Sequence, residues 1–370
     1  MKRLGVGIIG VTPGKSWAAL AHIPALQSLC DLYEVVAVST RSRTRAAAAA
    51  AAFGVPNAFD NHDELVRHSA VDLVVVTVRV PSHLELVSAA LEAGKHVFCE
   101  WPLGRELGEA EHMAALARDR DVHTAVGLQA RCAPSINYLR DLIRDGYVGE
   151  VLSTSMIGSG IGWGPVVDKA SLYSADKIQG ATLTSVPFAH AVDALSHVLG
   201  EFRQISATRA LRRSSVLLAE TSETVPMTAE DQVAASGVLE SGAVASLHFR
   251  GGSTRGGTEF LWEINGTEGD IQVTAPAGLV QMLDLTLKGA RGDRRTMELL
   301  SVPRKYHHVE RKSVLVLNVA EAYWWLAQDI AKGSHGCATF EDAVLRHRMI
   351  AAVERAADTG IRQTQPFRTH

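Results

Sequence analysis

The run Leu4-Gly5-Val6-Gly7-Ile8-Ile9-Gly10 is almost wholly apolar and passes directly into the turn Val11-Thr12-Pro13-Gly14. A short apolar run of this kind is typical of a strand buried on both faces, as in a parallel sheet. Three similar runs follow in the first third of the chain: Val35 to Ser39, Leu73 to Val78 and His96 to Glu100. This part of the chain is therefore predicted to form one parallel sheet.

Helical patterns lie between these runs. Arg43 to Phe53 is rich in alanine, the best helix former, and is predicted to be one crossover helix. In Ser82 to Ala93, Ser82 and Glu85 have the spacing of a capping box at the start of a second helix. Alternating strands and helices predict an α/β domain with the doubly wound parallel sheet of the Rossmann fold, over residues 1–128.

The pattern changes from about Glu150 to longer strand-like runs that follow one another closely. Hairpin signals such as Glu240-Ser241-Gly242 and Asn265-Gly266-Thr267 join several of them. This pattern predicts an α+β domain over residues 129–370, with an open, mainly antiparallel sheet. A last helix is expected over Val319 to Lys332, with its aromatic residues in the core or at a subunit interface. The runs are Val151 to Ile157, Gln204 to Ala210, Gln232 to Glu240, Ala243 to Phe249, Glu259 to Asn265 and Gly269 to Val273.

The composition excludes several classes of partner. The 370 residues carry 37 Lys+Arg against 40 Asp+Glu, a net charge of -3, so a nucleic acid or an anionic membrane surface is not an expected partner. No run approaches the roughly 18 apolar residues of a membrane span. The four cysteines are scattered without CxxC spacing, which predicts neither disulfides nor zinc and fits a cytoplasmic protein. The adjacent His307 and His308 lack an evident third ligand, so no metal site is predicted.

The turn after the first run and the end of the second run have the features of a dinucleotide site. Gly10 and Gly14 would let backbone amides approach a pyrophosphate, although the strict GxGxxG spacing is not kept. The segment Ser39-Thr40-Arg41-Ser42-Arg43 lacks the acidic residue that binds a ribose 2′-hydroxyl, and offers two arginines to a 2′-phosphate instead. NADP is therefore favoured over NAD, the alternative being that the arginines merely begin a solvated helix.

Four motifs, taken in order, resemble one known family. Gly94 to Leu103, which reads GKHVFCEWPL, is similar to that family's GKHVxxEKP strand and loop. Gly127 to Arg131, Gly146 to Glu150 and the HxxD of His190 to Asp193 are similar to its later motifs. Nearly the whole chain thus resembles the glucose-fructose oxidoreductase, inositol dehydrogenase and MocA family.

Within this family, the sequence is most similar to the subgroup of the fungal galactose-regulon repressor, a dinucleotide-binding member that acts through protein contacts. The likeness lies in Gly10 to Leu26, Glu100-Trp101, Leu128 to Arg131 and Gly162-Trp163. Pro102 departs from the subgroup toward the enzymes.

The resemblance implies a set of residues for each part of a site. Cofactor contacts are expected from Gly10, Thr12, Gly14, Lys15, Trp17, Ser39, Thr40, Arg41, Thr77, Val78, His83, Glu100, Trp101 and Gln129. Substrate contacts are expected from Trp101, Arg131, Trp163, Tyr173, Lys177 and Asp193.

Two of the family's three proton-handling positions are apolar here. Trp101 replaces the lysine, and Val186 stands four residues before His190, where the family often has an aspartate. His190 remains as a candidate general base, because an ordinary histidine pKa of about 6.5 suits catalysis near neutral pH. Each of these roles has an alternative. His190 could be a histidine of the core, and Trp101 could serve only in packing. Arg131 could pair with a local acid instead of a substrate.

Two functions follow from these observations. The first is an NAD(P)-dependent oxidoreductase that acts on a sugar, a polyol or a related hydroxylated molecule. The second is a catalytically silent, NADP-binding sensor or regulatory protein, for which a protein partner and a sugar-like effector would be expected. For either function, the family resemblance implies that residues 129–370 serve in substrate binding and oligomerisation, and that the protein forms a homodimer or homotetramer.

Overall fold

The computed structural model describes residues 3–310 and 313–364, and its contacts divide the chain into two compact units. The first unit comprises Met1–Cys132 and His307–Val344, and the second comprises Ala133–Tyr306 and Leu345–His370. The second boundary falls within one helix, α9 (Phe340–Thr359). The division into domains at 128/129 stays a prediction. The contacts group the C-terminal segment His307–Val344 with the first unit.

The first unit contains a six-stranded sheet in the order β3-β2-β1-β4-β5-β6, in which every neighbouring pair is parallel. The predicted Rossmann sheet is therefore confirmed. The strand order changes direction between β1 and β4, which is where such folds bind ligands. Two strands, β3 and β6, were not expected, because three residues are too few to show a pattern. The strands are β1 Leu4–Ile9, β2 Tyr33–Ser39, β3 Asn57–Phe59, β4 Leu73–Val76, β5 His96–Cys99 and β6 Thr124–Val126.

The helices of the first unit come from both ends of the chain. Helix α8 (Val314–Lys332) packs on α1 and on the turn Gln129–Cys132, and its Tyr323 is fully buried. The predicted capping box at Ser82 is wrong: Ser82 ends a 3-10 turn with ψ near -1°, and its side chain makes no capping bond. A capping side chain needs the extended backbone that Ser82 lacks. The other helices are α1 Ile23–Ser28, α2 Arg43–Phe53, α3 His62–Arg67, α4 His83–Glu92 and α5 Leu107–Asp119.

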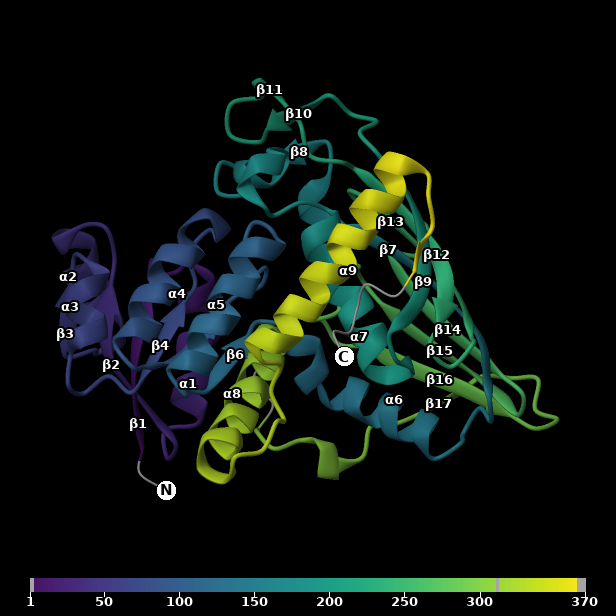
Figure 1. The fold of residues 1–370 in the computed structure, drawn as a ribbon, viewed down its shortest axis with the longest axis horizontal. Helices are drawn as coiled ribbons and strands as arrows, with labels where there is room; N and C mark the ends of the chain where they lie inside the picture. Colours follow the sequence, from purple (N-terminus) through teal and green to yellow (C-terminus); the bar gives the residue numbers. More distant parts are fainter. Residues whose placement is uncertain (1–2, 311–312, 365–370) are drawn as a thin grey trace. The chain divides into compact units, whose positions relative to one another are not determined.

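The second unit is built on a nine-stranded sheet in the order β17-β16-β15-β14-β7-β13-β12-β9-β18. Only the β7–β13 pair is parallel, so the predicted mainly antiparallel sheet is confirmed. Along β13, Ser246 and His248 are exposed while Leu247 and Phe249 are buried, which leaves one face of the sheet open. Figure 1 shows helices α6 and α7 together beside this sheet.

The bounds of these elements are β7 Val151–Gly160, β9 Phe202–Ala210, β12 Gln232–Leu239, β13 Val244–Gly251, β14 Phe260–Gly266, β15 Gly269–Ala275, β16 Thr286–Arg291, β17 Glu298–Leu299, β18 Gln363–Thr364, α6 Pro134–Arg144 and α7 Ala189–Leu199. A separate small sheet contains β8 Val166–Val167, β10 Ser215–Leu218 and β11 Thr224–Pro226. Among the described residues, no helix is long and apolar enough to span a membrane.

A buried ion cluster joins α9 to α7 within the second unit. The Arg346 guanidinium lies 3.2 Å from the Asp193 carboxylate through Nε, and 2.7 Å from the Glu201 carboxylate through Nη2. Arg346 and Asp193 are both 0% exposed. Removing the cation from such a cluster leaves buried carboxylates without compensation.

We therefore expect Arg346→Ala to lower the free energy of unfolding by about 3–5 kcal/mol, measured by urea denaturation. The matched control is Arg355→Ala on the same helix, where the arginine is exposed and the expected change is within about 0.5 kcal/mol. Equal losses in the two variants would contradict a special role for the buried cluster.

Candidate functional site

Glu100 lies at the centre of a polar cluster at the carboxyl end of the parallel sheet. It follows strand β5, and 16% of its side chain is exposed. Its Oε1 is 2.8 Å from His22 Nε2, and Gln129 Nε2 lies 2.9 Å from Oε1 and 3.1 Å from Oε2. His22 comes from the segment after β1 and Gln129 from the turn after β6. Because parallel strands end at one edge, three distant segments meet at this carboxylate.

A tyrosine from helix α8 completes the cluster. Tyr323 Oη lies 2.7 Å from His22 Nδ1, and the Tyr33 hydroxyl donates to the Tyr323 backbone carbonyl at 2.8 Å. An ionised carboxylate only accepts hydrogen bonds, so His22 Nε2–H donates to Glu100 and the Tyr323 hydroxyl donates to Nδ1. Burial raises the pKa of Tyr323 well above its ordinary value, which keeps this donor protonated.

The turn after β1 has the close backbone approach expected of a dinucleotide site. Gly10 has φ +103°, and an added Cβ would lie 2.7 Å from Val78 Cγ1, so only glycine fits there. Thr77 Oγ1 donates to the Ile9 carbonyl at 2.9 Å and ties β1 to the end of β4. Gly14 also has a positive φ, +68°, and open space around it.

Within that turn, some backbone donors are already used. The Thr12 amide donates to Ser16 Oγ at 2.8 Å, and the amides of Lys15 and Ser16 donate to the Thr12 carbonyl. The Lys15 side chain is exposed, and no ion pair involves it in the described part of the chain. Trp17 is half-buried and meets the His22 ring edge to face, with centroids 6.4 Å apart.

The end of β2 presents arginines without acidic partners. Ser39 is buried and donates to the Asn61 carbonyl at 2.9 Å, and the Thr40 hydroxyl donates to the Ser42 carbonyl at 2.9 Å. Arg41 and Arg43 are exposed, and neither makes an ion pair within residues 3–310 and 313–364. This end of the sheet therefore carries positive charge that is available to an anion.

His83 and Trp101 lie in the buried layer behind these loops. His83 is 1% exposed, with Nδ1 at 2.9 Å from the Pro102 carbonyl and Nε2 at 3.0 Å from the Val78 carbonyl. Burial lowers the pKa of His83, and a neutral imidazole has one N–H, so it donates to only one of these two carbonyls. Trp101 is 6% exposed and precedes Pro102 through a cis peptide bond. Cofactor contacts for His83 and Trp101 stay predictions.

Arg131 has a carboxylate partner in its own unit. Its Nη1 lies 2.7 Å from Asp342 Oδ1, and 13% of the arginine side chain is exposed. Asp342 is thus a local acid that pairs with Arg131, one of the two roles expected of this arginine, and the substrate contact of Arg131 stays a prediction.

In the second unit, His190 lies in the first turn of α7 and is 3% exposed. Asp193 lies one turn further on and is held by Arg346. Its contact with Arg346 fixes α7, and its predicted substrate contact stays a prediction.

The segment before α7 carries the remaining predicted substrate residues. Trp163 donates its indole N–H to the Ala181 carbonyl at 3.1 Å, and it lies with Pro187 against Gly160. Tyr173 is half-buried in a 3-10 turn. The side chain of Lys177 is exposed, and its backbone amide donates to Thr228 Oγ1 at 3.1 Å. Trp163 thus borders the turn that leads to His190.

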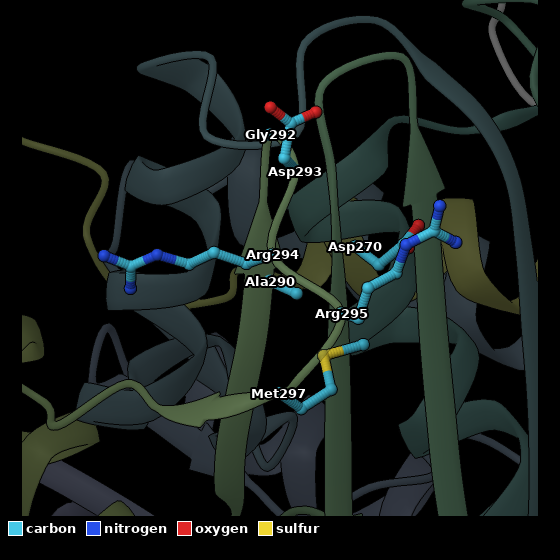
Figure 2. Close-up of a pocket in the computed structure, with 7 residues that line it drawn as sticks. All are labelled: Asp270, Ala290, Gly292, Asp293, Arg294, Arg295 and Met297. Atoms are coloured by element: carbon cyan, nitrogen blue, oxygen red, sulfur yellow. The ribbon is translucent and has the colours of Figure 1, made fainter.

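Figure 2 shows a pocket elsewhere in the second unit, at the ends of β15 and β16. Arg294 and Arg295 point in different directions from its rim, and Arg294 pairs with Glu298 at 2.5 Å. No predicted site residue lines it, so it is not a candidate for the chemistry. Among the described residues, no group of three His, Cys, Asp or Glu side chains could hold a metal ion.

Sequence reasoning missed His22 and Tyr323 as parts of the site. His22 lies within Gly10 to Leu26, the range that resembles one subgroup, and a histidine just after the first turn is a usable signal. Tyr323 is 301 residues from His22, and no local pattern links them.

Comparisons with known proteins agree with this geometry. Residues 4–128 match the family model "Oxidoreductase family, NAD-binding Rossmann fold", and residues 134–275 match "Gal80p, C-terminal domain". The dehydrogenase aclE of Aspergillus oryzae is 29% identical, with 97% of each chain covered. The galactose/lactose metabolism regulatory protein GAL80 of Kluyveromyces lactis is 26% identical over 95% of this chain and 93% of its own.

A solved structure shows the same fold. It is a super-repressor mutant of Gal80p from Saccharomyces cerevisiae, with a TM-score of 0.91, 24% identity and full coverage of both chains. Residues 4–128 thus contain the NAD-binding Rossmann domain of the oxidoreductase family of glucose-fructose oxidoreductase, inositol dehydrogenase and MocA, and residues 134–275 are similar to the C-terminal domain of Gal80p.

Proposed function

We propose that this chain is an NADP-dependent oxidoreductase that acts on a hydroxyl group of a sugar, a polyol or a related small molecule. The observation that carries the proposal is the Glu100 and Gln129 pair at the carboxyl end of the parallel sheet, after β5 and β6. Gln129 Oε1 is buried and has no hydrogen-bond partner among the described residues, as expected of an acceptor that serves a ligand.

The residues at the sheet edge fit a dinucleotide. Gly10 leaves no room for a side chain, and Lys15 and Arg41 are exposed cations without ion pairs in the described ranges. Lys15 would neutralise the pyrophosphate, and Arg41 with Arg43 would bind a 2′-phosphate. NAD is the alternative if these arginines serve only as the solvated start of α2.

The chemistry assigned to the bound nicotinamide is hydride transfer at its C4 atom. His190 would take the hydroxyl proton of the substrate as general base, and the buried Asp193–Arg346 pair would hold the helix that carries it. Trp101 and Val186 cannot move a proton, so the rate would depend on His190 and on positioning. The other residues proposed for the substrate are Trp163, Tyr173 and Lys177.

A second candidate function is a cofactor-binding regulator without catalysis. It is favoured by the apolar residues Trp101 and Val186 and by the match of residues 134–275 to the C-terminal domain of Gal80p. Such a protein would bind a protein partner. In both cases the open sheet face, where 56% of Val244 and 39% of Ile157 are exposed, would pair two copies into a homodimer.

The arginines at the end of β2 should make NADPH bind more tightly than NADH. Arg41→Ala is expected to weaken NADPH about tenfold, because a charge-assisted hydrogen bond contributes about 1.5–3 kcal/mol, and to leave NADH unchanged. Fluorescence titration would measure both affinities. The control is Arg120→Ala, which removes an equally exposed charge from the end of α5. Equal affinities for the two cofactors in the unaltered chain would refute the NADP assignment.

The enzyme and regulator functions separate in a turnover assay. We expect the chain with NADP and a pool of sugars, polyols and sugar acids to form reduced nicotinamide, read by its absorbance, and His190→Asn to lose this activity. No turnover, in a chain shown to bind NADPH, would favour the regulator. Turnover that survives in His190→Asn would remove His190 from the role of base.

A further inference from the structure

We propose that Tyr323 and His22 are positioning residues that hold Glu100 for the nicotinamide half of the cofactor. This inference rests on the proposed dinucleotide binding of the first unit, and it makes a C-terminal helix part of an N-terminal site. It gives a structural role to Tyr323 and His22, which the motif resemblance did not place in the site.

Both hydrogen bonds of His22 are directed along one path, from Tyr323 through the imidazole to Glu100. The Tyr323 hydroxyl donates to His22 Nδ1 at 2.7 Å, which leaves the ring proton on Nε2, aimed at Glu100 Oε1 at 2.8 Å. The tautomer of a histidine is set by the partner of its other ring nitrogen. Without the Tyr323 hydroxyl, the imidazole loses the partner that selects this tautomer.

The residues of the cluster behind Glu100 are shielded from solvent, so the cluster is not a proton-transfer pathway. Tyr323 is 0% exposed, Tyr33 is 2% exposed and the His22 side chain is 0% exposed. Glu100, at 16%, is the member that reaches the surface. A chain that ends in buried phenols cannot pass a proton to water, so its effect on Glu100 is to fix its orientation.

Glu100 and Gln129 together present acceptors to a ligand. Gln129 uses its Nε2 on both carboxylate oxygens, which turns its amide so that Oε1 remains an acceptor. Space behind the carboxylate is also closed, because a Cβ at Gly127 would lie 2.7 Å from Glu100 Oε2. The matching donors are the ribose hydroxyls or the carboxamide N–H groups of the nicotinamide half.

The two halves of the cofactor site can be tested apart. In a doubly wound sheet, the two mononucleotide-binding halves lie on either side of the switch point. Arg41 follows β2 in the first half, while Glu100 and Gln129 follow β5 and β6 in the second. Adenosine 2′,5′-bisphosphate would report on the first half alone, and NADPH on both.

The test is Tyr323→Phe in the full-length chain, titrated with NADPH and with adenosine 2′,5′-bisphosphate. We expect NADPH to bind about fivefold more weakly and the bisphosphate to bind within about twofold of the unaltered chain, the range expected for one buried hydrogen bond. Tyr33→Phe is the matched control. It removes a buried hydroxyl whose hydrogen bond, within the described residues, goes to the Tyr323 backbone carbonyl, and both affinities should stay within about twofold.

Two further variants keep the inference testable if Tyr323→Phe folds poorly. His22→Gln keeps a donor and an acceptor and should retain more NADPH affinity than His22→Leu. Gly127→Ala pushes on the Glu100 carboxylate from the other side and should weaken NADPH without affecting the bisphosphate.

The outcomes separate the inference from the proposed function. Equal effects of Tyr323→Phe and Tyr33→Phe, or parallel losses of both ligands in each variant, would overturn the positioning role while leaving cofactor binding intact. An unaltered chain that binds neither ligand would overturn the proposed function and this inference with it.

Discussion

The partly buried carboxylate of Glu100 is the constraint on which the first unit depends. A charge in this position is costly unless donors surround it, and two donors reach it at 2.8 and 2.9 Å from segments far apart in sequence. Those segments meet because strands β1, β5 and β6 are parallel and end at one edge. Helix α8, which packs on this unit through apolar side chains, adds the Tyr323 hydroxyl that hydrogen-bonds His22. One carboxylate thus ties the cofactor end of the sheet to the C-terminal segment.

A second buried charge organises the other unit. Arg346 holds Asp193 on α7 and Glu201 just beyond it, so the helix that carries His190 is fixed by electrostatics as well as by packing. With Trp101 in place of the family lysine, His190 has to manage the proton alone in the enzyme that we propose. The two units therefore use one principle: a polar residue is kept in place by a partner that is itself fully buried.

Much of the fold could be predicted from the sequence because periodic apolar patterns are local. Helix α2 was predicted with the bounds that it has, and the longer strands were found within a few residues. Strand β3 was missed because it is too short, and Ser82 failed as a cap because a 3-10 turn sets its backbone. The residues of the candidate site were harder to predict from the sequence than the fold. Motif likeness predicted Glu100 and Gln129 but could not show that Asp193 faces an arginine, or that Tyr323 lies beside His22.

The central claim is that the first unit binds a nicotinamide dinucleotide although the family lysine is absent. Calorimetric titration of NADPH into the purified full-length chain tests it most directly. The account predicts saturable binding of one NADPH per chain, competed by adenosine 2′,5′-bisphosphate. No heat of binding and no competition, with a chain shown to be folded, would contradict it.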